Sequence, residues 1–156
     1  MPADKKTKNE AFKKMAALCS RSEQCSPDIR KKLIAFGLNE DEAEDVLENL
    51  KGEKFIDDER FAKAYVAEKF RINKWGRIKI RYYLKAKGLD EQTIEAGLGN
   101  LDKEKYKAAL LKTMKEKARK LKKKNKFEKM GQIIRFAQSR GFEPELIHRH
   151  MDDIVS

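Results

Sequence analysis

The side chains best suited to catalysis or metal binding are few, and their spacing argues against both. His148 and His150 stand two positions apart, so on a helix they point to different faces and do not readily share a metal ion. Cys19 and Cys25 have no nearby histidine, and a reducing cytosol disfavours a disulfide between them. We therefore expect two free thiols, no metal site and no cofactor.

One run of acids, Asp57-Asp58-Glu59, is of a kind that some metal sites use. The run stands at the N-terminus of a predicted helix, where the helix dipole favours negative side chains. We interpret it as helix capping. Because the sequence also lacks an HExxH pair, a Walker-type loop and a GxGxxG motif, it predicts no catalytic residues and a protein that is not an enzyme.

Positive charge is the stronger signal, because it is gathered in two stretches. Residues 69–87 contain eight basic side chains and no acid, and residues 112–126 contain nine basic side chains and one acid. Clustered lysine and arginine neutralise the phosphates of nucleic acid; the alternative is that both stretches are solvated helix faces. The candidate nucleic-acid-binding residues are Lys69, Arg71, Lys74, Arg77, Lys79, Arg81, Lys85, Lys87, Arg119, Lys122, Lys123, Lys124 and Lys126.

Aromatic side chains stand among the first group of cations. Proteins that bind single strands stack bases on aromatic rings beside basic residues. Tyr82 is expected to be exposed, Tyr83 to fall on the core side of its helix, and Trp75 either to stack bases or to staple the start of a helix. The acidic stretch, residues 40–59, has ten acids and two lysines; it is either a solvated face or a surface that docks a basic protein.

These side chains must be positioned by a repeating unit, because one pattern recurs about every 52 residues. In each copy an isoleucine is followed eight positions later by a glycine, and thirteen positions after that by an aliphatic residue. The three copies are Ile29, Gly37 and Leu50; Ile80, Gly88 and Leu101; and Ile133, Gly141 and Ile154.

Helix signals fill each copy of the pattern. Ser26-Pro27-Asp28 predicts a helix start with Ser26 as the N-cap, and Asn39 with Glu42 predicts a capping box. In the last repeat we expect helices over residues 103–124 and 127–140 and from Pro144. The sequence thus predicts an all-α fold of about nine helices, in three tandem three-helix repeats that form an elongated, curved array. The expected boundaries are a disordered basic tail at 1–9 and repeats at 10–52, 53–101 and 102–156.

The overall composition agrees with a nucleic-acid partner. The chain has 37 Lys and Arg against 26 Asp and Glu, a net charge of +11, which implies a polyanionic partner. No apolar run approaches the roughly 20 residues that a membrane span needs, and residues 1–14 lack the apolar core of a signal peptide. We therefore expect a cytoplasmic protein with no membrane contact, and a monomer.

Several motifs resemble those of the RecX family of bacterial recombination regulators. The resemblance covers residues 15–101 and is closest over 50–88. It is carried by Ile56-Asp57-Asp58-Glu59-Arg60-Phe61-Ala62, Tyr65-Val66, Gly76-Arg77, Ile80 and Lys87-Gly88, with Arg21-Ser22 and Ile29-Arg30-Lys31-Lys32-Leu33 before them.

The resemblance implies a partner and a mode of action. It implies that the protein binds the RecA recombinase in the groove of the RecA–single-stranded DNA filament, and inhibits filament growth, ATP hydrolysis and strand exchange. Expected partners are thus the RecA filament and single-stranded DNA, with duplex DNA as an alternative. Two other functions stay open: a general nucleic-acid-binding helical protein with no RecA role, and a protein-interaction scaffold whose charge serves solubility.

Overall fold

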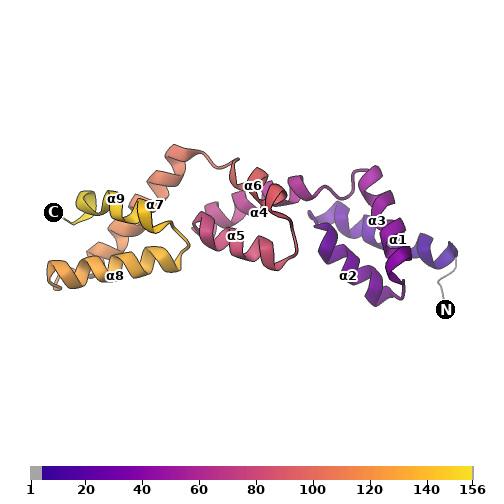
Figure 1. Cartoon of the computed structure of the whole chain (residues 1–156), viewed down its shortest axis with the longest axis horizontal. Coiled ribbons are helices and arrows are strands. Elements are labelled where there is room, and N and C mark those ends of the chain that lie inside the picture. Colours follow the sequence, from indigo (N-terminus) through magenta and orange to yellow (C-terminus); the bar gives the residue numbers. More distant parts are fainter. Residues whose placement is uncertain (1–4, 156) are drawn as a thin grey trace. The chain divides into compact units, whose positions relative to one another are not determined.

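A computed structural model describes residues 5–155, and this part of the chain is all α-helical (Figure 1). It contains nine helices and no strand. The helices are α1 (Lys5–Arg21), α2 (Ser26–Phe36), α3 (Glu40–Gly52), α4 (Asp58–Arg71), α5 (Arg77–Ala86), α6 (Glu91–Leu98), α7 (Lys103–Lys120), α8 (Lys126–Ser139) and α9 (Pro144–Ile154). The predicted fold class is therefore confirmed, while the division into three repeats stays a prediction.

The start of α1 corrects one expectation. Residues 5–9 are helical, so the prediction of a disordered tail is wrong for them, and residues 1–4 lie outside the described part of the chain. The helix reaches this far because its next turn is anchored: Ala11 is fully buried, and Lys8 Nζ lies 3.0 Å from an Asp45 carboxylate oxygen. The polar sequence of residues 5–9 gave no sign of these contacts, because Asp45 lies far along the chain.

Capping explains why the helices begin and end where they do. Asn39 Oδ1 accepts from the Glu42 N–H at 2.9 Å and the Glu42 carboxylate accepts from the Asn39 N–H at 2.8 Å, which confirms the predicted capping box. Gly37 ends α2 with φ of +119°, in the left-handed region that favours glycine. The predicted N-cap of α2 was wrong by one residue, because Cys25 holds that position.

Ser26 has a different role from the one expected. Its N–H donates to Asp58 Oδ1 at 2.7 Å and its hydroxyl donates to Asp58 Oδ2 at 2.5 Å. Asp57 supplies the local cap of α4 instead, accepting from the Arg60 N–H at 3.1 Å. The two neighbouring acids therefore have different roles. Asp57 caps its own helix, α4, whereas Asp58 binds Ser26 at the start of α2, 32 residues earlier.

The chain divides into two compact units. Unit 1 comprises residues up to 64 together with 84–97, and unit 2 comprises residues 65–83 and 98 onward. In unit 1, helices α1, α2 and α3 enclose an apolar core that includes Met15, Ile29, Leu33, Leu47 and Leu50. Leu47 and Leu50 are the contribution of α3 to this group.

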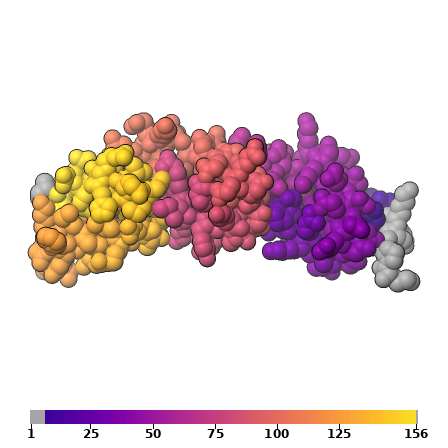
Figure 2. Space-filling model, viewed as in Figure 1, coloured from indigo at the N-terminus to yellow at the C-terminus, as the bar shows by residue number. Residues whose placement is uncertain are grey.

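Unit 2 has its own core, where α7, α8 and α9 pack together. Its largest fully buried side chains are Tyr106 and Phe142. The orange and yellow atoms of α8 and α9 form a continuous surface on the face that Figure 2 shows. Helix α7 ends at Lys120 and not near residue 124 as predicted, since buried Leu121 begins a turn that leads into α8.

Candidate nucleic-acid interface

The turn between α4 and α5 positions the first candidate surface. Lys74 adopts a left-handed conformation with φ of +60°, and the Trp75 N–H donates to the Lys69 carbonyl at 3.2 Å. The turn is also held from the α8–α9 turn of the same unit. The Gly76 N–H donates to the Arg140 carbonyl at 2.7 Å, and the Ile78 N–H donates to the Gly141 carbonyl at 3.0 Å.

Around this turn, on α4, the turn itself and α5, lies a group of side chains that we call the aromatic–lysine cluster: Lys69, Trp75, Lys79, Tyr82 and Tyr83. The Trp75 and Tyr83 rings are stacked, with centroids 4.9 Å apart, and the Tyr82 ring meets Tyr83 edge-on at 5.3 Å. Stacked and edge-to-face geometries are the favourable ones for aromatic pairs. The cluster is therefore an ordered surface feature and not three independent rings.

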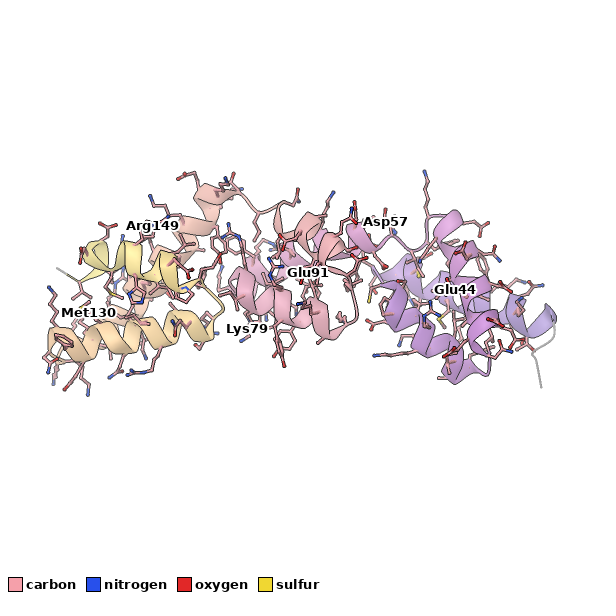
Figure 3. The ribbon with its side chains drawn as sticks, in the orientation of Figure 1. Glu44, Asp57, Lys79, Glu91, Met130 and Arg149 are labelled. Carbon is pink, nitrogen blue, oxygen red and sulfur yellow. The ribbon has the colours of Figure 1, made fainter. Side chains whose placement is uncertain are left out.

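Two ammonium groups flank the tryptophan. Lys79 Nζ lies 4.8 Å and Lys69 Nζ lies 5.3 Å from the Trp75 ring centroid, both within range of a cation–π attraction. Lys79 extends from α5 (Figure 3). Both lysines are candidates predicted from the sequence, and in the structure both ammonium groups lie over the same ring.

The exposure of the tyrosines decides what the cluster can do. Tyr82 is 68 % exposed, as expected, and Tyr83 is 41 % exposed, so the prediction that Tyr83 faces the core was wrong. Trp75 supplies the reason, because it offers Tyr83 a stacking partner on the surface. Exposed tyrosine rings that contact a tryptophan with two ammonium groups over it have the chemistry of a base-stacking platform for single strands.

Two isoleucines extend the exposed apolar surface of unit 2, and sequence reasoning missed both. Ile72 is 57 % exposed and Ile78 is 49 % exposed. The exposure of Ile78 could have been predicted. Ile80, two positions later, is buried, so Ile78 must lie near the opposite side of α5. Ile72 follows the end of α4, where helical phase gives no information. Ile78 stands four positions before exposed Tyr82 on α5 and shares a face with it, and exposed apolar side chains that share a face mark interaction surfaces.

Arg77, another candidate, is engaged inside unit 2. Its guanidinium donates to Glu143 at 2.7 Å and lies 3.8 Å from the Tyr106 ring centroid. The Arg77 N–H also donates to the Tyr106 hydroxyl at 2.9 Å, and that hydroxyl donates to Glu143. Burial, followed by the Glu143 hydrogen bond, raises the pKa of Tyr106 well above its usual value. Arg77 therefore has the contacts of a structural residue.

Lys85 and Lys87 have acidic partners in unit 1. Lys87 Nζ lies 3.0 Å from an Asp28 carboxylate oxygen, and Lys85 Nζ lies 3.0 Å from a Glu91 oxygen. Burial alone would raise the pKa of Asp28, but hydrogen bonds from Lys87 and Cys25 outweigh it and lower that pKa. The Lys87–Asp28 pair, with both side chains about one-third exposed, fixes the start of α2.

Exposure sorts the thirteen candidate residues into two groups. The partly buried ones are Lys69, Arg77, Lys79, Arg81 and Lys87. The exposed ones are Arg71, Lys74, Lys85, Arg119, Lys122, Lys123, Lys124 and Lys126.

The second basic stretch forms a shallow groove at the end of α7. The groove has a volume of about 300 Å³ and is lined by four cations and no acid: Lys115, Arg119, Lys122 and Lys129, with Ala118 and Ile154 between them. Phe127, next to candidate Lys126, is 89 % exposed. Lys115, Lys129 and Phe127 were not among the predicted site residues. This groove has the charge needed to hold phosphates.

Other kinds of site find little support in the part of the chain that the structure describes. Residues 5–155 contain no group of three or more His, Cys, Asp or Glu side chains arranged around a metal position. Cys19 and Cys25 are free thiols, as predicted, and burial raises the pKa of Cys25 to about 11. None of the described helices is long and apolar enough to cross a membrane.

Comparison with known proteins gives one consistent result. Residues 57–98 match the family model described as RecX, second three-helix domain. The regulatory protein RecX of Clostridium tetani is 32 % identical over 139 residues, which is 88 % of this chain and 62 % of the relative. The regulatory protein RecX of Clostridium perfringens is 31 % identical over 140 residues, covering 88 % of this chain and 63 % of the relative. The chain thus spans less than two thirds of the length of these relatives.

Solved structures share the fold at lower identity. A crystal structure of RecX from Lactobacillus salivarius superposes with a TM-score of 0.89 at 17 % identity, over 96 % of this chain and 97 % of that one. A second crystal structure of regulatory protein RecX gives a TM-score of 0.83 at 23 % identity, over 94 % and 73 %. At these sequence identities, the similarity of the structures is evidence for the fold alone.

Proposed function

Because this chain belongs to the RecX family, we propose that it acts as a regulator of RecA: it binds RecA–single-stranded DNA filaments and inhibits their growth, their ATP hydrolysis and strand exchange. The relatives are named as regulatory proteins, which supports a regulatory role. The observation that carries the DNA part of the proposal is the aromatic–lysine cluster. Tyr82 offers an exposed ring to a base, and Lys69 and Lys79, whose ammonium groups lie over the Trp75 ring of the same cluster, supply charge for phosphates.

The contact surface that we propose contains only some of the thirteen residues predicted from the sequence. Its main cations are Lys69 and Lys79, and exposed Arg71 and Lys74 are near them in the chain. Arg77 is left out because Glu143 and Tyr106 already hold its guanidinium. Lys87 is likewise engaged, by Asp28.

Acidic α3 is a candidate for the protein side of the contact. Within unit 1, Arg30 pairs with Glu44 and Lys8 pairs with Asp45. Glu40, Asp41 and Glu48 are exposed, and they present negative charge to a basic surface of a partner.

The first test is RecA-dependent ATP hydrolysis on single-stranded DNA, titrated with this protein below the RecA concentration. We expect strong inhibition at low ratios, because action on a filament needs few molecules whereas competition for DNA needs many. The Lys69→Glu/Lys79→Glu variant should need at least about tenfold more protein for half-inhibition, since it reverses two charges beside the stacking ring. Tyr82→Ala should weaken inhibition without altering the charge.

A matched control separates this surface from net charge. Lys13→Glu/Lys63→Glu makes the same charge change at exposed positions outside the cluster, and should inhibit like the original protein. Circular dichroism and urea unfolding check that each variant is folded. Equal inhibition by both folded double variants would rule out the cluster as the contact surface.

A second candidate function is RecA-independent nucleic-acid binding, favoured by the groove of four cations at the end of α7. It predicts inhibition only after the DNA is saturated, and an affinity for single strands that RecA does not change. The same titration at two DNA concentrations distinguishes the two functions. Under this alternative, the protein concentration that gives half-inhibition rises with the DNA concentration. Under the leading proposal, it rises with the concentration of RecA filament.

A further inference from the structure

A groove between α1 and α2 of unit 1 is lined differently from the surfaces described so far. It has a volume of about 390 Å³. Its apolar part is formed by Met15, Leu18 and Phe36, and its charged part by Lys14, Arg21 and Lys32. No acid lines it, in a unit that contains the most acidic segment of the chain.

The spacing of these residues explains how two helices make one groove. Lys14, Leu18 and Arg21 are four and three positions apart, so they form a stripe on α1. Lys32 and Phe36 are four positions apart and form the facing stripe on α2. Helices α1 and α2 contact each other in unit 1, which brings the two stripes to opposite sides of a shared apolar floor.

The side chains in the groove are available to a ligand. Lys14, Arg21 and Lys32 are exposed, and Leu18 and Phe36 are only half-buried. Lys14 Nζ lies 5.5 Å from the Phe36 ring centroid, so one cation already rests on the apolar part. Within residues 5–155 neither Arg21 nor Lys32 has a carboxylate partner.

We propose that this groove binds an acidic segment of a partner protein that carries a bulky apolar side chain. Three cations without a local acid attract carboxylates, and the apolar floor gives an anchoring side chain a place to be desolvated. An amphipathic segment laid between two helices is a common mode of peptide recognition. The proposal does not depend on the proposed function, because no residue of the aromatic–lysine cluster takes part.

Nucleic acid fits the groove less well than an acidic peptide. Single-strand binders offer an open ring face to each base, and here the one aromatic ring is half-buried with an ammonium group against it. Aliphatic Met15 and Leu18 complete the floor. They suit a leucine or phenylalanine side chain and have no ring to stack with a base.

The experiment measures fluorescence anisotropy of the whole protein with three labelled synthetic peptides of equal length. The first is rich in aspartate and glutamate and contains one leucine and one phenylalanine. The second has both apolar residues replaced by glycine, and the third has every acid replaced by its amide. We expect the first peptide to bind at least about tenfold more tightly than either of the others, because the groove requires both features.

Two charge-reversed proteins make the test specific. Lys14→Glu/Lys32→Glu changes the groove, whereas Lys13→Glu/Lys31→Glu makes the same change on the same two helices at exposed positions beside it. The groove variant should lose at least about tenfold in affinity for the first peptide, and the control less than about threefold.

Labelled oligothymidylate serves as the nucleic-acid probe. The groove variant and the control should bind it equally. Equal binding of all three peptides, equal loss in both variants, or a selective loss of oligothymidylate binding in the groove variant would each overturn the proposal. The last outcome would assign the groove to nucleic acid. Retained inhibition of RecA alongside any of them would leave the proposed function untouched.

Discussion

Lysine and arginine residues that look alike in the sequence have distinct roles in the structure. Lys79 is partly buried, and its ammonium group lies 4.8 Å from the ring centroid of Trp75, which is also partly buried. Arg77, two positions earlier, is held by Glu143 and stacked on Tyr106. A basic stretch therefore contains both contact candidates and structural residues, and only the partners of each side chain separate them.

Gly76 and Gly141 face each other where the α4–α5 turn meets the α8–α9 turn. A Cβ on Gly76 would lie 2.5 Å from the Gly141 carbonyl carbon. A Cβ on Gly141 would lie 2.4 Å from Lys79 Cβ, at a φ of +96°. We expect Gly76→Ala and Gly141→Ala each to lower the free energy of unfolding by about 3 kcal/mol, because backbone must move to make room. Urea unfolding of each variant measures it.

Gly52→Ala is the matched control. Nothing lies within 4 Å of a Cβ added at this last position of α3. Its free energy of unfolding should change by less than about 0.5 kcal/mol. A loss at Gly76 as small as at Gly52 would mean that the two turns separate at little cost.

Sequence reasoning succeeded where the signal is local and failed where a partner is far along the chain. The pair of Asn39 and Glu42 needs only three residues to be recognised, and the capping box is present. Arg77 and Glu143 are 66 residues apart, and no local sequence pattern around either residue predicts their contact. For the same reason the stacking of Tyr83 on Trp75 was not foreseen, since helical phase describes one helix at a time.

At the scale of elements, the start of α2 shows how helices of unit 1 are tied together. Asp28 lies in the first turn, where the helix dipole favours an acid. Its carboxylate accepts from Lys87 at 3.0 Å, beyond the end of α5. Hydrogen bonding thus adds to the dipole, and both effects favour the charged carboxylate.

The Asp28–Lys87 pair predicts a dependence of stability on pH. Because folding lowers the pKa of Asp28, the pair stabilises the protein above the unfolded pKa of about 3.9, and this contribution is lost as pH falls through the lower folded value. Asp28→Asn should lower the free energy of unfolding at pH 7 by up to about 1 kcal/mol, since solvent partly screens the pair. The difference from the original protein should shrink as pH falls below about 3.9 and vanish once the pH is below the folded pKa of Asp28.

Lys87→Gln provides the control through a double-mutant cycle at pH 7. The double variant should be little less stable than either single variant, because each change removes the same interaction. A difference between Asp28→Asn and the original protein that is the same at pH 7 and in acid would show that packing, and not charge, gives Asp28 its role.

For the whole molecule, the net charge of +11 raises the question of which cations serve a partner. The last turn of α7 holds Lys117, Arg119 and Lys120, where cations are expected because they complement the helix dipole. That argument does not extend to Lys122, Lys123 and Lys124 in the turn, nor to Lys126, which opens α8 at the end where the dipole disfavours a cation. Their charge has no structural explanation, so a polyanion is the best reason for it.

The salt dependence of single-strand binding tests this basic turn. Each phosphate contact contributes about 0.7 to the slope of log affinity against log salt concentration on single strands. If all four lysines meet phosphates, Lys122→Gln/Lys123→Gln/Lys124→Gln/Lys126→Gln should reduce that slope by about 3 for oligothymidylate. The control replaces four lysines of unit 1 by glutamine at positions 13, 31, 51 and 63, which removes the same charge and should change the slope by less than about 1. Equal changes in the two variants would mean that the net charge of the molecule, and not this turn, attracts the strand.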